Sequence, residues 1–286
     1  SKDEIVRMIT GSRSEKLYPQ AERQFGEEVV LKVDGLTGKP LPSGVRPVDI
    51  SFEVHKGEIV AITGLMGAGK TETARLLWGI DPIESGKIQI EGKIVRIRSP
   101  RDACRHGIAL IPEERRAQGF IPMLSVAANI TLPVLSKIAY AGFLKRTLES
   151  AIAQKWIETL SIACAGYKQK VAFLSGGNQQ KVIVAKGLET NPKVLLVDEP
   201  TKGIDVGAKA ALRKLLIKIA GTGVAIVMFT SEIEEAMEVA DKIIVMHRGR
   251  ITARFRRGEA NKEEIMACAM GAAKRGDASE DKNDGV

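Results

Sequence analysis

The stretch GLMGAGKT, residues 64–71, decides how this chain folds. It fits the phosphate-loop pattern Gly-x-x-x-x-Gly-Lys-Ser/Thr through Gly64, Gly69, Lys70 and Thr71. Glycines allow backbone N–H groups to turn inward around phosphate oxygens, and the lysine adds a positive charge at the β- and γ-phosphates. The other loop residues that we predict to line the nucleotide are Leu65, Met66, Gly67 and Ala68.

The residues on either side of this loop provide the context that the pattern requires. EIVAITG, residues 58–64, is a continuous apolar run typical of a buried parallel strand, and TETARLLWG, 71–79, continues as a helix. The positive N-terminus of that helix would face the anion. We therefore predict that the loop binds the phosphates of ATP and that the Thr71 hydroxyl coordinates Mg²⁺.

A second apolar strand ends in two carboxylates. It lies in KVLLVDEPT, residues 193–201, and places Asp198 and Glu199 at its carboxyl end, where ligands bind in α/β sheets. Asp198 is predicted to hold Mg²⁺ directly or through water, and Glu199 to orient or deprotonate an attacking water. A solvent-exposed Asp-Glu-Pro turn is the alternative, which the upstream phosphate loop disfavours.

The stretch LSGGNQQK, residues 174–181, lies between these two motifs. Ser175 is predicted to cap a helix that Gly176 and Gly177 open, which leaves N–H groups bare for an anion. An ordinary capped helix is the alternative. One molecule has little need for two such sites for a γ-phosphate, whereas two molecules that face each other head to tail would use both.

Alternating apolar and amphipathic stretches predict the rest of the fold. From about residue 176 to residue 249, helical and strand-like patterns alternate, which indicates a doubly wound α/β core. Between 115 and 172 the apolar spacing becomes helical, which indicates an insertion. Earlier strands are expected at 29–36, 48–54, 87–92 and 107–113.

The two ends of the chain have different patterns. Ser1 to Glu4 form a capping box that predicts a short helix, followed by a polar linker. A last helix is expected near 262–270, and the small, charged residues 272–286 predict disorder.

Composition excludes several kinds of protein. Three widely spaced cysteines argue against a disulfide framework or a zinc site. No apolar run approaches the roughly 20 residues of a membrane span, so any action at a membrane would go through a partner. The net charge is +8, but carboxylates are interspersed with the basic residues and aromatics are scarce. We therefore expect a solvated surface and no nucleic-acid partner.

The order of GLMGAGKT, LSGGNQQK, LLVDEP and GID (203–205) resembles that of the ABC-transporter ATPases over about residues 28–255. LSGGNQQK, DEPTKGIDVGA and GLMGAGKTE look still closer to the second, C-terminal cassette of sugar-import ATPases of the ribose, galactose and xylose class, which carry two cassettes in one chain. DEIVRMITGS at the start resembles the tail of a first cassette. We therefore expect residues 1–27 to be an inter-cassette linker and the chain to be a second half.

This resemblance implies a fold and a partnership. The fold is an α/β phosphate-loop ATPase core with a parallel sheet, an antiparallel β-subdomain, an inserted α-helical subdomain at about 115–180, and a C-terminal helix and tail at 256–286. The activity is ATP hydrolysis that drives a transmembrane permease, from the cytoplasmic face of the membrane, with an extracytoplasmic sugar-binding protein. Asp205 would contact the first cassette. The signature residues, which would contact the ATP of that cassette, are Leu174, Ser175, Gly176, Gly177, Asn178 and Gln179.

The chain departs from this family at two positions near the nucleotide. Glu113 stands where a glutamine is usual, and Glu232 stands where a histidine is usual. A carboxylate there repels the γ-phosphate and cannot donate as imidazole does. No aromatic residue that would stack on adenine lies between Phe25 and Phe52, and Val45 or Pro47 offers only an apolar face.

We therefore predict a site that binds MgATP but turns it over slowly, and a signature that serves the partner cassette. Harmless variation at Glu113 and Glu232 is the alternative. Other functions left open are an importer of nucleosides or other polar solutes, a soluble ABC ATPase that acts on DNA or ribosomes, and a non-hydrolysing regulatory module, which Glu199 argues against.

Overall fold

The computed structural model describes residues 25–40, 44–140 and 142–272. The predicted N-terminal helix, almost all of the predicted linker and nearly all of the predicted disordered tail lie outside these residues. Within them, no helix combines the length and the apolar character needed to cross a membrane.

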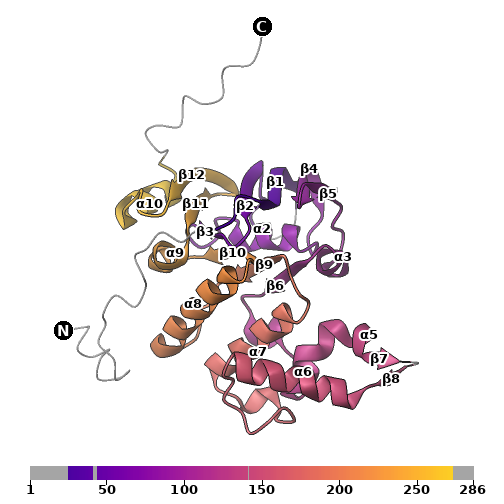
Figure 1. The fold of residues 1–286 in the computed structure, drawn as a ribbon. Coiled ribbons are helices and arrows are strands. Elements are labelled where there is room, and N and C mark those ends of the chain that lie inside the picture. The colour runs from indigo at the N-terminus through magenta and orange to yellow at the C-terminus, as the bar shows by residue number, and fades with distance from the viewer. Residues whose placement is uncertain (1–24, 41–43, 141, 273–286) are drawn as a thin grey trace, which may run out of the picture.

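A six-stranded sheet forms the centre of the molecule (Figure 1). Its five parallel strands were expected from their continuous apolar runs, and all five are buried on both faces. An antiparallel strand that the sequence pattern did not indicate closes one edge. In spatial order the strands are β12 (Arg250–Arg256), β11 (Lys242–His247), β3 (Ile59–Thr63), β10 (Ala225–Thr230), β9 (Val194–Asp198) and β6 (Ile108–Ile111).

The register of this sheet aligns the predicted functional segments. Thr63, the last residue of β3, pairs with Thr230 at the end of β10, and Val197 of β9 pairs with Ile111 at the end of β6. The carboxyl ends of parallel strands share one edge of a sheet. The phosphate loop, Asp198-Glu199 and the segments that follow β6 and β10 therefore all begin at that edge.

Helices cover both faces of the sheet, and each face has its own hydrophobic core. Side chains of β3 alternate between the two cores, with Ile59 and Ala61 in one and Val60 and Ile62 in the other. The first core includes α7 (Gly176–Leu188), α8 (Val206–Gly221), α9 (Ile233–Val239) and α10 (Lys262–Ala269). The second includes α2 (Lys70–Leu77), α3 (Pro100–Arg105) and the inner side of a second sheet.

The second sheet is entirely antiparallel. Its strands, in spatial order, are β2 (Ile50–His55), β1 (Val29–Gly38), β4 (Ile83–Ile90) and β5 (Lys93–Val95). The strand expected at 87–92 starts earlier and ends at Ile90, because Glu91 and Gly92 both have positive φ, 49° and 74°. Two such residues make the tight turn of a β-hairpin, which leads into β5.

The segment between β6 and α7 is largely helical and extends away from the main sheet (Figure 1). Buried Asn129, which interrupts its apolar run, accepts a hydrogen bond from the Ile121 N–H at 2.7 Å and donates to the Leu124 carbonyl at 3.3 Å. A short hairpin at its far end was not expected. The elements of the whole segment between β6 and α7 are η1 (Arg115–Gly119), α4 (Val126–Thr131), η2 (Leu132–Val134), α5 (Leu135–Ile138), β7 (Ala139–Tyr140), β8 (Phe143–Leu144), α6 (Arg146–Thr159) and η3 (Val171–Phe173).

Candidate nucleotide site

The phosphate loop runs from the end of β3 to the start of α2 and depends on its two motif glycines. Gly64 has φ 157°, and a Cβ atom there would lie 2.3 Å from the Met246 carbonyl oxygen of β11. Gly69, with φ 100°, is the N-cap residue that precedes α2. Neither position accepts a side chain without a shift of the backbone. Of the other loop residues, Met66 is 89% exposed at the tip and Ala68 is buried.

Lys70 spans the inside of this loop. Its side chain is 6% exposed, and Nζ donates to the carbonyl oxygens of Gly64 at 2.9 Å and Leu65 at 3.1 Å. Glu199 Oε1 lies 4.0 Å from Nζ. Burial lowers the pKa of Lys70, while Glu199 and Asp198 oppose that change. The ammonium group is thus held within the loop, where a phosphate would need it.

Asp198 and Thr71 are the oxygen donors predicted to hold Mg²⁺. The Thr71 hydroxyl donates a hydrogen bond to Asp198 Oδ1 at 3.4 Å. Burial raises the pKa of Asp198 to about 7, the bond from Thr71 opposes the rise, and Glu113 and Glu199 add to it. A carboxyl group among other carboxylates is stabilised in its charged form by a cation, and oxygen donors are the ligands that Mg²⁺ prefers. The donors therefore fit Mg²⁺ held jointly with nucleotide phosphates.

Glu199 has an unusual backbone conformation. Its φ is 43°, in the left-handed region, which costs a residue other than glycine roughly 1–3 kcal/mol. The Glu199 N–H donates to the Phe229 carbonyl oxygen of β10 at 2.8 Å, which stabilises this turn. The turn places a carboxylate that is 13% exposed next to Lys70. Such a group can orient or deprotonate a water at the phosphate end.

The structure brings Glu113 to the same site. Glu113 follows β6 and adds to the rise in the pKa of Asp198. Glu232 precedes the first residue of α9, two residues after the pair between Thr230 and Thr63. Each of these carboxylates has a lysine partner that sequence reasoning missed. Glu113 Oε1 lies 2.5 Å from Lys202 Nζ, and Glu232 Oε1 lies 2.5 Å from Lys209 Nζ.

The signature residues occupy a different part of the fold, at the start of α7. Ser175 is the N-cap residue of α7 and Gly176 opens the helix, as predicted, but Ser175 Oγ makes no capping hydrogen bond and instead accepts one from Asn178 Nδ2 at 2.8 Å. Leu174 is buried, and buried Gln179 donates to the Val171 carbonyl oxygen at 3.3 Å. These two side chains therefore stabilise the surrounding structure.

A groove of about 520 Å³ joins the signature to the start of α8. Ser175, Gly177 and Asn178 line one side and Asp205 lies on the other. Asp205 also caps α8, because Oδ1 accepts a hydrogen bond from the Ala208 N–H at 2.9 Å. The predicted contact residue thus shares a surface with the signature.

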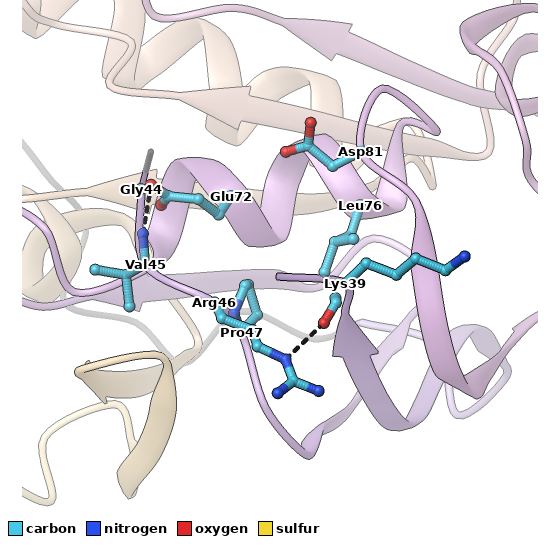
Figure 2. Close-up of a pocket in the computed structure, with 9 residues that line it drawn as sticks. Lys39, Gly44, Val45, Arg46, Pro47, Glu72, Leu76 and Asp81 are labelled. Carbon is cyan, nitrogen blue, oxygen red and sulfur yellow. Dashed lines mark hydrogen bonds between the residues drawn. The ribbon is translucent and has the colours of Figure 1, made fainter. Parts of the chain in front are cut away.

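Residues 44–47, which include the two candidates for an apolar face toward adenine, lie against α2 (Figure 2). The Val45 N–H donates to Glu72 Oε1 at 3.3 Å, and Arg46 Nε donates to the Gly38 carbonyl oxygen at 2.8 Å. The pocket between them, of about 10 Å³, has room for one water. Pro47 is buried and cannot offer a face to a base, which leaves half-buried Val45.

The chain is similar in sequence to known proteins over most of its length. A family described as ABC transporter matches residues 48–202. Ribose import ATP-binding protein RbsA 2 of Streptomyces avermitilis is 44% identical over 273 residues, which are 96% of this chain and 53% of the relative. Ribose import ATP-binding protein RbsA of Geobacillus kaustophilus is 41% identical over 269 residues, or 94% of this chain and 53% of the relative. The chain therefore spans about half the length of the curated relatives that it matches.

Solved structures share the fold. An ATP-binding cassette of an ABC transporter in its ADP conformation superposes with a TM-score of 0.67 at 23% identity and covers 83% of this chain and 93% of its own. The protein cbiO1 from Clostridium perfringens, part of the ABC transporter complex cbiONQ, gives 0.68 at 24% identity and covers 82% and 90%. The expected phosphate-loop core with an antiparallel sheet and added helices is therefore confirmed.

Proposed function

Because this chain belongs to the ABC transporter family, we propose that it binds MgATP and forms one ATP-hydrolysing cassette of a bacterial sugar importer. One observation carries the nucleotide part of this proposal. Lys70, Thr71, Asp198 and Glu199 come from two segments far apart in sequence and meet at one edge of the main sheet. Together they provide a cation for the phosphates, oxygen donors for Mg²⁺, and a carboxylate for the attacking water.

The solute part of the proposal is supported by the relatives. They are named as ribose import proteins, and the similarity covers 96% of this chain in the first of them. We therefore propose a pentose or related sugar as the imported solute. A nucleoside is the second candidate, and direct transport measurements distinguish the two.

We also propose that this chain functions as one half of a head-to-tail pair with a second ATP-binding cassette. The groove that the signature shares with Asp205 would receive the ATP of that cassette in a head-to-tail pair. The relatives are about twice as long as this chain, which fits a first cassette in the same polypeptide. The helical segment at about 115–180 would dock a permease near Glu113, at the cytoplasmic face of the membrane.

Slow turnover at this cassette's own phosphate loop is part of the same proposal. Glu113 and Glu232 are carboxylates at positions that face the phosphate edge, and neither acts as a neutral hydrogen-bond donor when charged. ATP bound here would therefore hold the two cassettes together, while hydrolysis depends on this chain's signature at the partner's ATP.

The test is ATP binding by this chain followed by transport in the whole protein. Titration with ATP and Mg²⁺ should show binding that Lys70→Ala abolishes and that Lys87→Ala, at an exposed position on β4, leaves intact. With its permease and binding protein in vesicles, the full-length protein should take up ribose when ATP is supplied inside. Uptake of nucleosides but not of ribose would replace the sugar assignment, and absence of ATP binding would refute the proposal as a whole.

A further inference from the structure

The two unusual carboxylates of the nucleotide site are both paired with lysines from the segment that follows Glu199. We infer that Lys202 and Lys209 are positioning residues that hold Glu113 and Glu232 as ion pairs, so that this site accepts the negative charge of MgATP. The inference rests on the proposed binding of nucleotide at this phosphate loop. It assigns roles to Lys202, which lies within DEPTKGIDVGA but had no role there, and to Lys209, which follows that stretch.

The first pair connects two loops at the carboxyl edge of the sheet. Lys202 Nζ lies 2.5 Å from Glu113 Oε1, and the Lys202 N–H donates to the Glu199 carbonyl oxygen at 3.1 Å. The backbone of Lys202 is therefore fixed next to the proposed catalytic carboxylate. The hydrogen bond to Glu113 raises the pKa of Lys202, so its side chain stays charged across the neutral range. Since Lys202 is 61% exposed, this pair adds little to the stability of the fold.

The second pair, Lys209 with Glu232, also joins the segment after Glu199 to a carboxylate that follows a strand of the main sheet. Lys209 lies in the first turns of α8, which Asp205 caps, and its Nζ lies 2.5 Å from Glu232 Oε1. The Lys209 side chain is 24% exposed, so helix packing restricts where its ammonium group can reach. Glu232 is in turn fixed by a hydrogen bond from its own N–H to Thr230 Oγ1 at 3.1 Å. Both partners of this pair are thus held by their backbones.

The charge balance of the site explains why such pairs matter for an anionic ligand. Apart from these lysines, Lys70 shares the carboxyl edge of the sheet with Asp198, Glu199 and Glu113, whose charges oppose the lowering of its pKa, and with Glu232, two residues beyond the end of β10. With Lys202 and Lys209 counted, three positive charges face four negative ones. A phosphate that approaches then meets two neutral ion pairs in place of two bare anions, which removes most of the repulsion expected from sequence.

The experiment uses the full-length protein with the phosphate loop of the partner cassette inactivated, so that MgATP binding reports this site. Lys202→Met and Lys209→Met should each weaken MgATP binding about threefold, and together about tenfold. Lys87→Met removes the same charge from an exposed position on β4, in the second sheet, and should have no effect. The decisive variants are the doubles Glu113→Gln with Lys202→Met and Glu232→Gln with Lys209→Met, which should bind MgATP as the unmodified protein does.

Each outcome distinguishes this role from another. Doubles that bind as weakly as the single lysine variants would show that the lysines contact phosphate directly, and would overturn the inference. An equal loss in Lys87→Met would show a general effect of net charge and would also overturn it. Lys202→Arg should retain affinity, and the thermal unfolding of the nucleotide-free variants should not change. Failure of the unmodified protein to bind MgATP at this site would instead refute the proposed function.

Discussion

Replacing Asp198 by asparagine should make the nucleotide-free chain more stable, and the gain should grow with pH. Asp198 is 4% exposed, and burial raises its pKa from 3.8 to about 7. A carboxyl group whose folded pKa lies above its unfolded pKa binds more protons in the folded state. Stability is therefore lost as the pH rises from about 4 to about 7, and stays low above that.

The size of the effect follows from this pKa. Relative to the unfolded chain, the raised pKa costs the folded state about 2 kcal/mol near pH 5, where the buried group stays protonated while the unfolded one ionises, and about 4 kcal/mol near pH 8, where both ionise, from 1.36 kcal/mol for each pKa unit. Asparagine has nearly the same shape, its oxygen can still accept from the Thr71 hydroxyl, and it does not ionise. Asp198→Asn should therefore stabilise the chain by up to these amounts and weaken its response to Mg²⁺.

Urea unfolding of the nucleotide-free chain near pH 5 and pH 8, with and without the substitution, measures this difference. Asp102→Asn is the matched control, because the hydrogen bonds that Asp102 accepts from the Ser99 hydroxyl and the Arg98 N–H lower its pKa. Asp102 is therefore ionised in the folded and unfolded chain at both pH values, and its substitution should change the free energy of unfolding equally at the two. A free energy of unfolding that changes equally at both pH values in Asp198→Asn would refute the argument. It would show that burial does not destabilise the ionised form of Asp198.

Three further predictions concern other parts of the chain. On the proposal that the signature serves the partner's ATP, Ser175→Ala or Gly177→Ala in the full-length protein should lower ATP turnover by about tenfold or more, and Glu199→Gln by less than about threefold; equal losses in a turnover assay would contradict this asymmetry. Gly64→Ala should abolish MgATP binding in a titration, because its Cβ would lie 2.3 Å from the Met246 carbonyl oxygen, whereas Gly221→Ala, at the end of α8 with no atom within 4 Å of a Cβ, should leave binding unchanged. Asn129→Ala should lower the free energy of unfolding by about 2–4 kcal/mol, because it leaves the Ile121 N–H without its partner, while exposed Ser136→Ala should change it by less than about 0.5 kcal/mol.

Local patterns allowed part of the fold and site to be predicted. The phosphate loop and Asp198-Glu199 were identified because each motif lies beside its own apolar strand, and parallel strands bring their carboxyl ends together. The end of the strand expected at 87–92 was misplaced because Glu91 has a positive φ. Glutamate rarely adopts that conformation, so the sequence gives no sign of the turn there. The edge strand β12 was missed for a different reason, since its charged residues give no continuous apolar run.

Other features depend on contacts between distant segments. Ser175 takes the predicted N-cap position, but its hydroxyl accepts a hydrogen bond from the Asn178 side chain in place of one from the helix backbone. Lys202 and Lys209 are far in sequence from Glu113 and Glu232, so only the folded chain shows which carboxylates they pair with. Sequence alone therefore predicted repulsion at Glu113 and Glu232 where the fold places ion pairs.

The position of β3 in the main sheet has a consequence for how the protein is made. Both neighbours of β3, β10 and β11, come from the last quarter of the chain. During synthesis the phosphate loop leaves the ribosome long before the strands that hold it in place. We expect a nascent chain that ends before Ala225 to lack a formed phosphate loop, however much of the antiparallel sheet has already folded. Nucleotide would then bind only after β10 and β11 have been made, so ATP would favour chains that contain both strands.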